Sequence, residues 1–164
     1  MNIKLTIEYD GTDYSGWQVQ PEQRTVQGEL ETAIARMLGD KVIVYAAGRT
    51  DSGVHAAGQI AHISIINGKL RCDQIRNGLN SLTGFDLYIR DLTEVDESFH
   101  ARYSAISRVY KYRLIRSPNP LLRRYSWHPH HEWDDQKISE AADLLIGEHS
   151  FKSFCRPRPD ETEY

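Results

Sequence analysis

The residues best suited to chemistry lie in one short polar loop, residues 47–56, which reads A-G-R-T-D-S-G-V-H-A. Gly48 and Gly53 bracket the loop, and glycine adopts a positive φ without a steric penalty. Such a loop can hold Arg49 and Asp51 at a fixed place on the end of a sheet. An Asp beside an Arg stays ionised, because the positive neighbour favours the carboxylate. A charged carboxylate that points outward can act as a nucleophile.

Three other interpretations of this loop stay open on residue types alone. Asp-Ser-Gly is common turn chemistry, because Asp and Ser side chains bond to nearby backbone amides. The Arg and the Asp can form an ion pair that only ties the loop down, worth about 0 to 1 kcal/mol if exposed. Asp51, Ser52 and His55 also supply the residue types of a hydrolase triad, although close sequence neighbours rarely reach triad geometry.

A second segment, residues 99–131, is basic and aromatic although the whole chain carries a net charge of −3. It contains no Asp or Glu. Basic side chains alternating with aromatic rings suit a nucleic-acid backbone and its unstacked bases, while a solvated strand balanced by acidic neighbours is the plainer alternative. The basic residues are Arg102, Arg108, Lys111, Arg113, Arg116, Arg123 and Arg124, and the aromatic ones interleaved with them include Tyr103, Tyr110, Tyr112, Tyr125 and Trp127.

The histidines of the run H-P-H-H, residues 128–131, raise the question of a metal site. No carboxylate or Cys stands at ligand spacing to complete a coordination shell, so the run is better explained as a surface loop. The sequence therefore predicts no metal.

These loops belong to a chain of 164 residues, 40% hydrophobic and 26% charged, which is typical of a globular protein of one domain or one domain and part of another. No apolar run approaches the roughly 20 residues that cross a bilayer, and no signal peptide is recognisable, so no membrane association is expected. The two cysteines, Cys72 and Cys155, are far apart, which favours free thiols in a reducing cytoplasm.

Hydrophobic periodicity predicts the elements that position the loop. Alternation indicates a half-buried strand over residues 2–10, and Thr25 caps a helix that runs to Leu38 and stops at Gly39. The resulting β-α-β-β-α-β order resembles a ferredoxin-like split unit, an α+β fold in which helices cover a mostly antiparallel sheet. The remaining predicted strands are 41–46, 59–66, 87–92 and 107–116, and the remaining helices are 73–82 and 134–146.

The polar segment 94–104 is the expected boundary between two parts of the chain. Residues 1–104 form an α+β domain that carries the polar loop, and residues 105–164 begin a second α+β domain. One strand and one helix are too little to bury a second core alone, so we expect this second domain to be incomplete.

Five motifs in order resemble the tRNA pseudouridine synthase A (TruA) family, over essentially the whole chain. The block G-R-T-D is specific by itself, and five ordered blocks make chance a poor explanation. The motifs are Y-D-G-T-D-Y-S-G-W-Q at 9–18, T-V-Q-G-E-L at 25–30, G-R-T-D-S-G-V-H-A at 48–56, F-H-A-R-Y-S-A at 99–105 and R-V-Y-K-Y at 108–112.

The resemblance implies an enzyme that isomerises uridine to pseudouridine in the anticodon stem-loop of tRNA. Family members are homodimers of two related halves and use no metal or organic cofactor. By resemblance, Asp51 is the nucleophile, Arg49 helps to extrude or hold the target nucleotide, and Tyr110 stacks on the flipped base. Arg102 and Arg113 are predicted to bind the tRNA.

The chemistry of the reaction agrees with these roles. A C–N glycosidic bond breaks, the uracil rotates and a C–C bond forms, so nothing is supplied from outside. The base must first leave its stack at a cost of a few kcal/mol, and stacking on an aromatic ring returns about 1 to 3 kcal/mol. The carboxylate can attack the ribose or the uracil ring, or take a proton from the ribose; the sequence does not choose among these routes.

The chain departs from the family pattern in two ways. Gly84 stands where the family usually has a proline, which is expected to loosen that turn. The second half of the family fold, with a helix beside the catalytic cleft and part of the dimer contact, is expected to be missing. The alternative to a synthase is therefore a shortened, inactive RNA-binding module that needs a partner for the other half.

Overall fold

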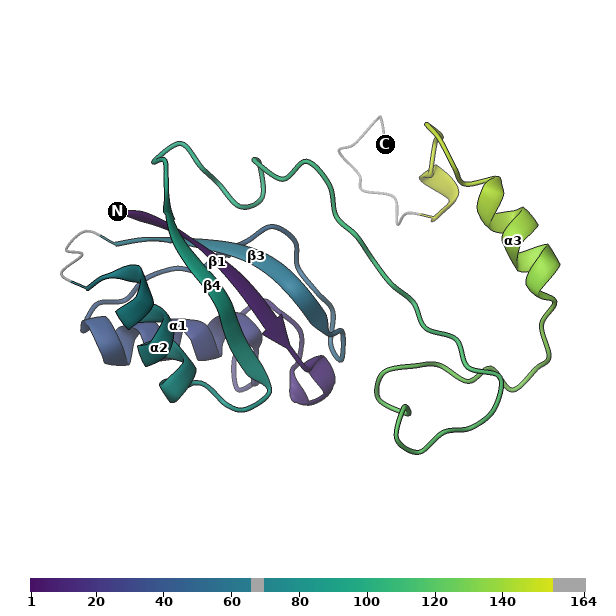
Figure 1. Ribbon diagram of the computed structural model, residues 1–164, viewed down its shortest axis with the longest axis horizontal. Helices are drawn as coiled ribbons and strands as arrows, with labels where there is room; N and C mark the ends of the chain where they lie inside the picture. Colours follow the sequence, from purple (N-terminus) through teal and green to yellow (C-terminus); the bar gives the residue numbers. More distant parts are fainter. Residues whose placement is uncertain (66–69, 155–164) are drawn as a thin grey trace. The chain divides into compact units, whose positions relative to one another are not determined.

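The sheet of this protein lies in the first of two compact units, Met1–Tyr110, and the second unit is Lys111–Tyr164. The computed structural model describes residues 1–65 and 70–154. The first unit contains β1 (Asn2–Tyr9), the short 3-10 helix η1 (Gly11–Asp13), α1 (Val26–Leu38), β2 (Tyr45–Ala46), β3 (Ala56–Ser64), α2 (Cys72–Leu82) and β4 (Leu87–Val95) (Figure 1).

The four strands form one antiparallel sheet in the order β2-β3-β1-β4. Together with the β-α-β-β-α-β order along the chain, this is the split arrangement of ferredoxin-like domains. Figure 1 shows α1 and α2 on the same face of the sheet. The α+β fold predicted from the sequence is therefore confirmed.

Alternating residues of β1 bury its helix-facing side. Ile3, Leu5 and Ile7 are fully buried, and Tyr9 is nearly so. They pack in one cluster with buried residues of α1 and α2, among them Leu30 and Leu79. Because the side chains of a strand alternate between its two faces, this core requires the polar residues of β1 to lie on the other face.

Local capping explains where α1 begins and ends. The Thr25 hydroxyl accepts a hydrogen bond of 3.2 Å from the Gly28 amide, which satisfies one of the free N–H groups of the first turn. Gly39 ends the helix with a left-handed φ of 77°. The start and the stop of this helix predicted from the sequence are therefore both confirmed.

Several strand boundaries differ from the prediction. β1 ends at Tyr9 and not at residue 10, and β4 continues to Val95 and does not end at residue 92. The strand predicted over 41–46 is reduced to Tyr45–Ala46, because the Val44 amide donates to the Glu31 carboxylate at 3.0 Å and not to a neighbouring strand. The strand predicted from Gln59 begins earlier, at Ala56, since Ala56 pairs with Tyr9. Its predicted end, residue 66, lies outside the described residues.

The strand predicted over 107–116 is wrong. In this described segment the chain forms only an isolated bridge, between Leu114 and Trp127. A strand needs a neighbour to pair its backbone groups, and the apolar side chains here have no surface to cover: Val109 is 94% exposed and Tyr112 is 76% exposed.

The second unit contains one longer helix, α3 (Asp135–Asp143), and a short 3-10 helix, η2 (Lys152–Phe154). The Asp134 side chain caps α3 by accepting from the amides of Gln136 and Lys137. The helix predicted over 134–146 therefore exists but is shorter. Among the described residues, no helix is long and apolar enough to cross a membrane.

Candidate active site

The polar loop predicted to carry the chemistry connects β2 to β3, and two residues of β3 hold the end of the loop that follows β2. The Ala47 amide donates to the Ile60 carbonyl at 2.7 Å, and the Gln59 side-chain amide donates to the Gly48 carbonyl at 2.6 Å. These bonds continue the hydrogen bonding of the sheet for two residues beyond β2. The loop therefore starts from a fixed position.

Arg108 adds a longer-range anchor at the same end. Its guanidinium donates to the Ala47 carbonyl through Nη2 at 2.6 Å and through Nε at 3.2 Å. The Arg108 side chain also lies against Gly48, where a Cβ would come within 3.3 Å of Nε. One basic residue of segment 99–131 thus holds the loop backbone.

The middle of the loop is held by the segment that follows β1. The Trp17 amide donates to the Thr50 carbonyl at 2.9 Å, and the Thr50 hydroxyl shares a hydrogen bond of 2.8 Å with the phenol of Tyr9. Gly16, the residue before Trp17, has a φ of 89°. A Cβ at Gly16 would stand 2.8 Å from the Thr50 carbonyl oxygen. Only glycine allows this close approach.

The far side of the loop is tied to Tyr14. The Tyr14 carbonyl accepts from the Gly53 amide and from the Ser52 hydroxyl, each at 3.3 Å. Gly53 has a φ of 78°, in the left-handed region expected of a turn glycine. Asp51 is therefore flanked on both sides by residues whose backbone or side chains are hydrogen-bonded to the segment after β1.

Asp51 and Arg49 are exposed and line the same hollow, a cavity of about 490 Å³. This volume falls within the range of about 300 to 1,000 Å³ that is usual for small-molecule sites. The carboxylate is thus accessible from solvent on a loop with a defined backbone. The other lining residues are Ser15, Trp17, Gln18, Gln20, Gln23, Thr50 and Ser52.

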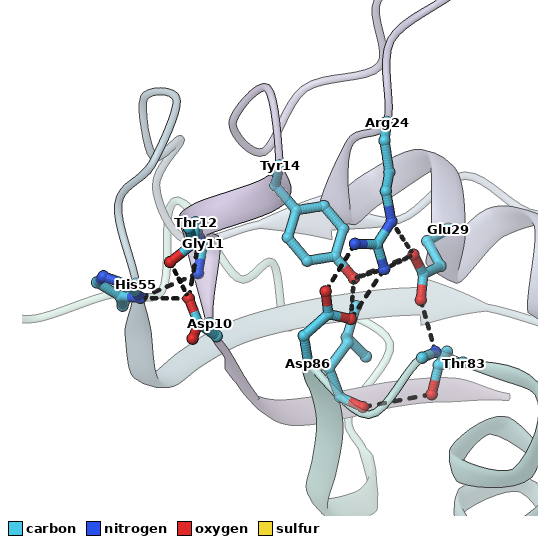
Figure 2. Close-up of polar contacts among 11 residues, drawn as sticks. Asp10, Gly11, Thr12, Tyr14, Arg24, Glu29, His55, Thr83 and Asp86 are labelled. Atoms are coloured by element: carbon cyan, nitrogen blue, oxygen red, sulfur yellow. Dashed lines mark hydrogen bonds and ion pairs between the residues drawn. The ribbon is translucent and has the colours of Figure 1, made fainter. Parts of the chain in front are cut away.

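The turn interpretation of the loop is supported, because the Val54 amide donates to the Asp51 carbonyl at 3.2 Å. The other two alternative roles find no support in the contacts of the loop. Among the ion pairs of the described residues, none joins Arg49 to Asp51. A hydrolase triad is contradicted, because the Ser52 hydroxyl donates to the Tyr14 carbonyl. The His55 ring contacts Gly11 and Asp10: its Nδ1 accepts from the Gly11 amide at 3.1 Å and lies 3.0 Å from an Asp10 carboxylate oxygen (Figure 2).

The other predicted site residues lie apart from the cavity or in the second unit. Tyr110 is 77% exposed and Arg102 is exposed, and neither is among the described residues that line the cavity. The Arg102 guanidinium lies 5.8 Å from the centre of the Tyr103 ring. Arg113 is an exposed residue of the second unit.

The sequence reasoning missed the glutamines of the cavity wall. Gln18, Gln20 and Gln23 come from the irregular segment between η1 and α1, which has no periodic pattern that would assign them a face. The available signal was the motif at 9–18, because that motif includes Trp17 and Gln18. Trp17 is buried and also borders the cavity.

The histidine run lies in the second unit. The Nδ1 atom of His128 is 3.1 Å from the Ile115 carbonyl oxygen, a contact that occupies one of its two nitrogens. Within 1–65 and 70–154, no three His, Cys, Asp or Glu side chains gather as a metal site would require.

Comparison with known proteins gives a consistent family. A family model described as tRNA pseudouridine synthase matches residues 5–104, which include most of β1, all of β2 to β4 and the Asp51 loop. The chain is 45% identical over 157 residues to tRNA pseudouridine synthase A of Brachyspira hyodysenteriae, covering 94% of this chain and 63% of that protein. It is also 45% identical over 159 residues to the protein of the same name from Bacillus pumilus, covering 94% and 64%.

A third relative, tRNA pseudouridine synthase A of Chlamydia felis, is 42% identical over 164 residues, covering 98% of this chain and 61% of the relative. The chain therefore spans 61–64% of the length of these three curated relatives. Because the matched region includes the sheet, both helices that cover it and the polar loop, the chain belongs to the tRNA pseudouridine synthase family.

Proposed function

We propose that this chain carries the nucleophile-bearing part of a tRNA pseudouridine synthase, with Asp51 as the nucleophile. The observation that carries the proposal is the placement of Asp51, exposed on a loop that is hydrogen-bonded on both sides and lining a cavity of about 490 Å³. A nucleophile must be accessible to a substrate and held near it, and Asp51 is exposed on a backbone that its neighbours Thr50, Ser52 and Gly53 hold in place.

The reaction is an isomerisation of a uridine in the anticodon stem-loop. The bond from the ribose C1′ to the uracil N1 breaks, the uracil turns, and C1′ bonds to C5. The proton that leaves C5 and the proton that N1 gains balance, so no oxidant, reductant or cofactor takes part. The Asp51 carboxylate assists by attack on the ribose or the uracil ring, or by removing a ribose proton.

Arg49 is proposed to hold the extruded nucleotide, because it lines the cavity with Asp51 and a guanidinium can bond a phosphate with two parallel N–H groups. Tyr110 is proposed to stack on the flipped base, and its 77% exposure leaves the ring open to such a contact. Arg102 and Arg113 are proposed to contact phosphates of the tRNA, since both are exposed cations.

We further propose that the whole protein is a cytoplasmic homodimer and that the two parts of this chain are domains divided near residue 104. Support for the cytoplasm comes from Cys72, which is a free thiol. Support for a division of the chain comes from its two compact units, whose boundary in the sequence follows Tyr110.

The test is to incubate the 164-residue protein with a tRNA transcript labelled with tritium at C5 of uridine. Pseudouridine formation releases that tritium, and we expect release from the unaltered chain and none from Asp51→Asn. Asp40→Asn is the matched control, because it removes the same charge from an exposed residue outside the cavity and should leave release unchanged.

Filter binding of the same tRNA separates the two outcomes that would contradict the proposal. Release that persists in Asp51→Asn would assign the nucleophile to another residue. Binding of tRNA without any release from the unaltered chain would make it an RNA-binding module that needs further segments for catalysis.

A further inference from the structure

The side chains of Tyr14, Arg24, Glu29 and Asp86 form a polar cluster with Arg24 at its centre (Figure 2). The Arg24 guanidinium donates to both oxygens of Asp86, at 2.6 and 2.8 Å. It also donates to one oxygen of Glu29 from Nε at 3.0 Å and from Nη2 at 2.7 Å. One side chain thus joins the start of α1 to the connection between α2 and β4.

Tyr14 occupies the space between the two carboxylates. Its ring lies under the guanidinium, 4.1 Å from the ring centre to Arg24 Cζ, and its hydroxyl accepts from Arg24 Nη2 at 3.0 Å. The hydroxyl is 3.0 Å from a Glu29 oxygen and 3.2 Å from an Asp86 oxygen. Since a phenol has one proton, it can donate to only one of them at a time.

The charges around Tyr14 depend on Arg24. Burial, followed by the negative charges of Glu29 and Asp86, raises the pKa of Tyr14 far above its usual value, so the phenol is neutral. The hydrogen bonds from Arg24 hold the pKa of Asp86 below its usual value. Without the guanidinium, two carboxylates would face each other across a single hydroxyl, and the Tyr14 side chain would lose its position.

Tyr14 connects this cluster to the Asp51 loop through its backbone. The same residue whose hydroxyl lies in the cluster offers its carbonyl to Ser52 and Gly53, which directly follow Asp51. A backbone hydrogen bond also connects Arg24 to the residue after Tyr14: the Ser15 amide donates to the Arg24 carbonyl at 2.8 Å. Arg24 itself is absent from the described residues that line the cavity.

We propose that Arg24 is a positioning residue for Asp51, acting through Tyr14. The proposal rests on the catalytic role proposed above for Asp51. It adds to that role that an ion-pair cluster outside the cavity holds the Asp51 loop in its conformation. A cluster that only stabilised the fold would affect the whole sheet equally, whereas a positioning cluster acts first on the loop.

The test compares amide hydrogen exchange in Arg24→Lys with that in the unaltered protein. Lysine keeps the charge but cannot form the forked contacts with two carboxylates. We expect the Gly53 amide to exchange about tenfold faster, while the Ala61 amide in β3 changes less than about twofold. Arg71→Lys is the matched control, because Arg71 makes an equally forked, exposed pair with Asp73 at the start of α2 and should leave both amides unchanged.

Tyr14→Phe provides a second variant in case Arg24→Lys unfolds the protein. It keeps the ring and the carbonyl and removes only the hydroxyl, so the Gly53 amide should again exchange faster than Ala61. Equal acceleration of the two amides in both variants, or an unchanged Gly53 amide, would overturn the proposal. In the tritium assay, Arg24→Lys should lower turnover without weakening tRNA binding.

The exchange measurement needs no catalysis, so the two proposals can fail separately. If the chain releases no tritium, exchange at Gly53 still decides whether Arg24 orders the loop. If Asp51→Asn retains activity while Arg24→Lys loosens the loop, the catalytic assignment fails and the ordering role remains.

Discussion

The phenol of Tyr9 and the hydroxyl of Thr50 share a hydrogen bond of 2.8 Å across 41 positions of sequence. Tyr9 is the last residue of β1 and is only 3% exposed, so this bond leads from the core to the residue before Asp51. Burial raises the pKa of the Tyr9 phenol, which keeps it neutral and able to take part in the bond. The loop is thus attached to the most buried strand of the sheet.

Tyr9→Phe should therefore weaken the fold and loosen the loop. The change keeps the buried ring and removes one hydrogen bond, so we expect a loss of about 1 kcal/mol in the free energy of unfolding. Urea unfolding followed by tryptophan fluorescence measures this difference. Tyr88→Phe in β4 is the control, because Tyr88 is 55% exposed and its loss of a hydroxyl should change the midpoint little. Equal midpoints for the two variants would argue against the Tyr9–Thr50 bond.

Gly11→Ala should be far more damaging, because the backbone of the loop passes directly beside Gly11. A Cβ at this position would stand 2.1 Å from the Val54 carbonyl oxygen. The carbonyl is main chain and the backbone fixes the Cβ, so neither group can rotate away. We expect a loss of more than about 2 kcal/mol in stability. Gly58→Ala in β3 is the matched control, since nothing lies within 4 Å of its Cβ position, and it should shift stability by less than about 0.5 kcal/mol.

His62 should make the stability of the first unit depend on pH. It lies in β3 with 5% exposure, stacks on Tyr45 with ring centres 5.1 Å apart, and has the His100 ring at 4.5 Å and the Phe99 ring at 6.1 Å. Its Nδ1 accepts from the Ala101 amide at 3.2 Å, which requires an unprotonated nitrogen. Burial first, and the neighbouring His100 second, lower the pKa of His62 below 6.5.

The folded protein therefore binds fewer protons at His62 than the unfolded chain does below about pH 6.5. The contribution of neutral His62 to the free energy of unfolding is complete above that pH. It is lost as the pH falls toward the lowered pKa that His62 has in the folded protein. Urea midpoints at pH 7.5 and pH 5.5 should differ, with the lower stability at pH 5.5. The difference should shrink in His62→Gln and persist in His149→Gln, an exposed histidine of the second unit. A difference that is the same in both variants would place the titrating group elsewhere.

Most of the first unit could be predicted because its signals are local. Alternation in β1, the Thr25 cap and the Gly39 stop each depend on a few adjacent residues, and each is present in the structure. The strand predicted over 107–116 failed for the opposite reason. Its pattern was suitable, but pairing depends on a neighbouring strand, and a short sequence window cannot supply that information.

Part of the candidate site could likewise be predicted from the sequence and part could not. The motif around Asp51 identified the loop, and its exposure agrees with the chemistry proposed for it. The contacts that hold the loop were not predictable, because Tyr9, Tyr14 and Arg108 reach it from 38 to 61 positions away. Arg108 is an example. The basic composition of segment 99–131 suggested that it contacts a phosphate, whereas its guanidinium donates to the Ala47 carbonyl.

Arg113→Gln should reduce the salt dependence of tRNA binding if Arg113 contacts a phosphate. Each neutralised phosphate releases condensed counterions, so the slope of log affinity against log salt should fall by about 1 when one contact is lost. Filter binding between 50 and 200 mM salt, about the range over which such slopes are resolved, provides the measurement. Lys41→Gln is the matched control, because it removes one exposed positive charge from the first unit, outside the basic segment 99–131. A slope that changes equally in both variants would show a general effect of net charge, and an unchanged slope in Arg113→Gln would remove this residue from the tRNA contact.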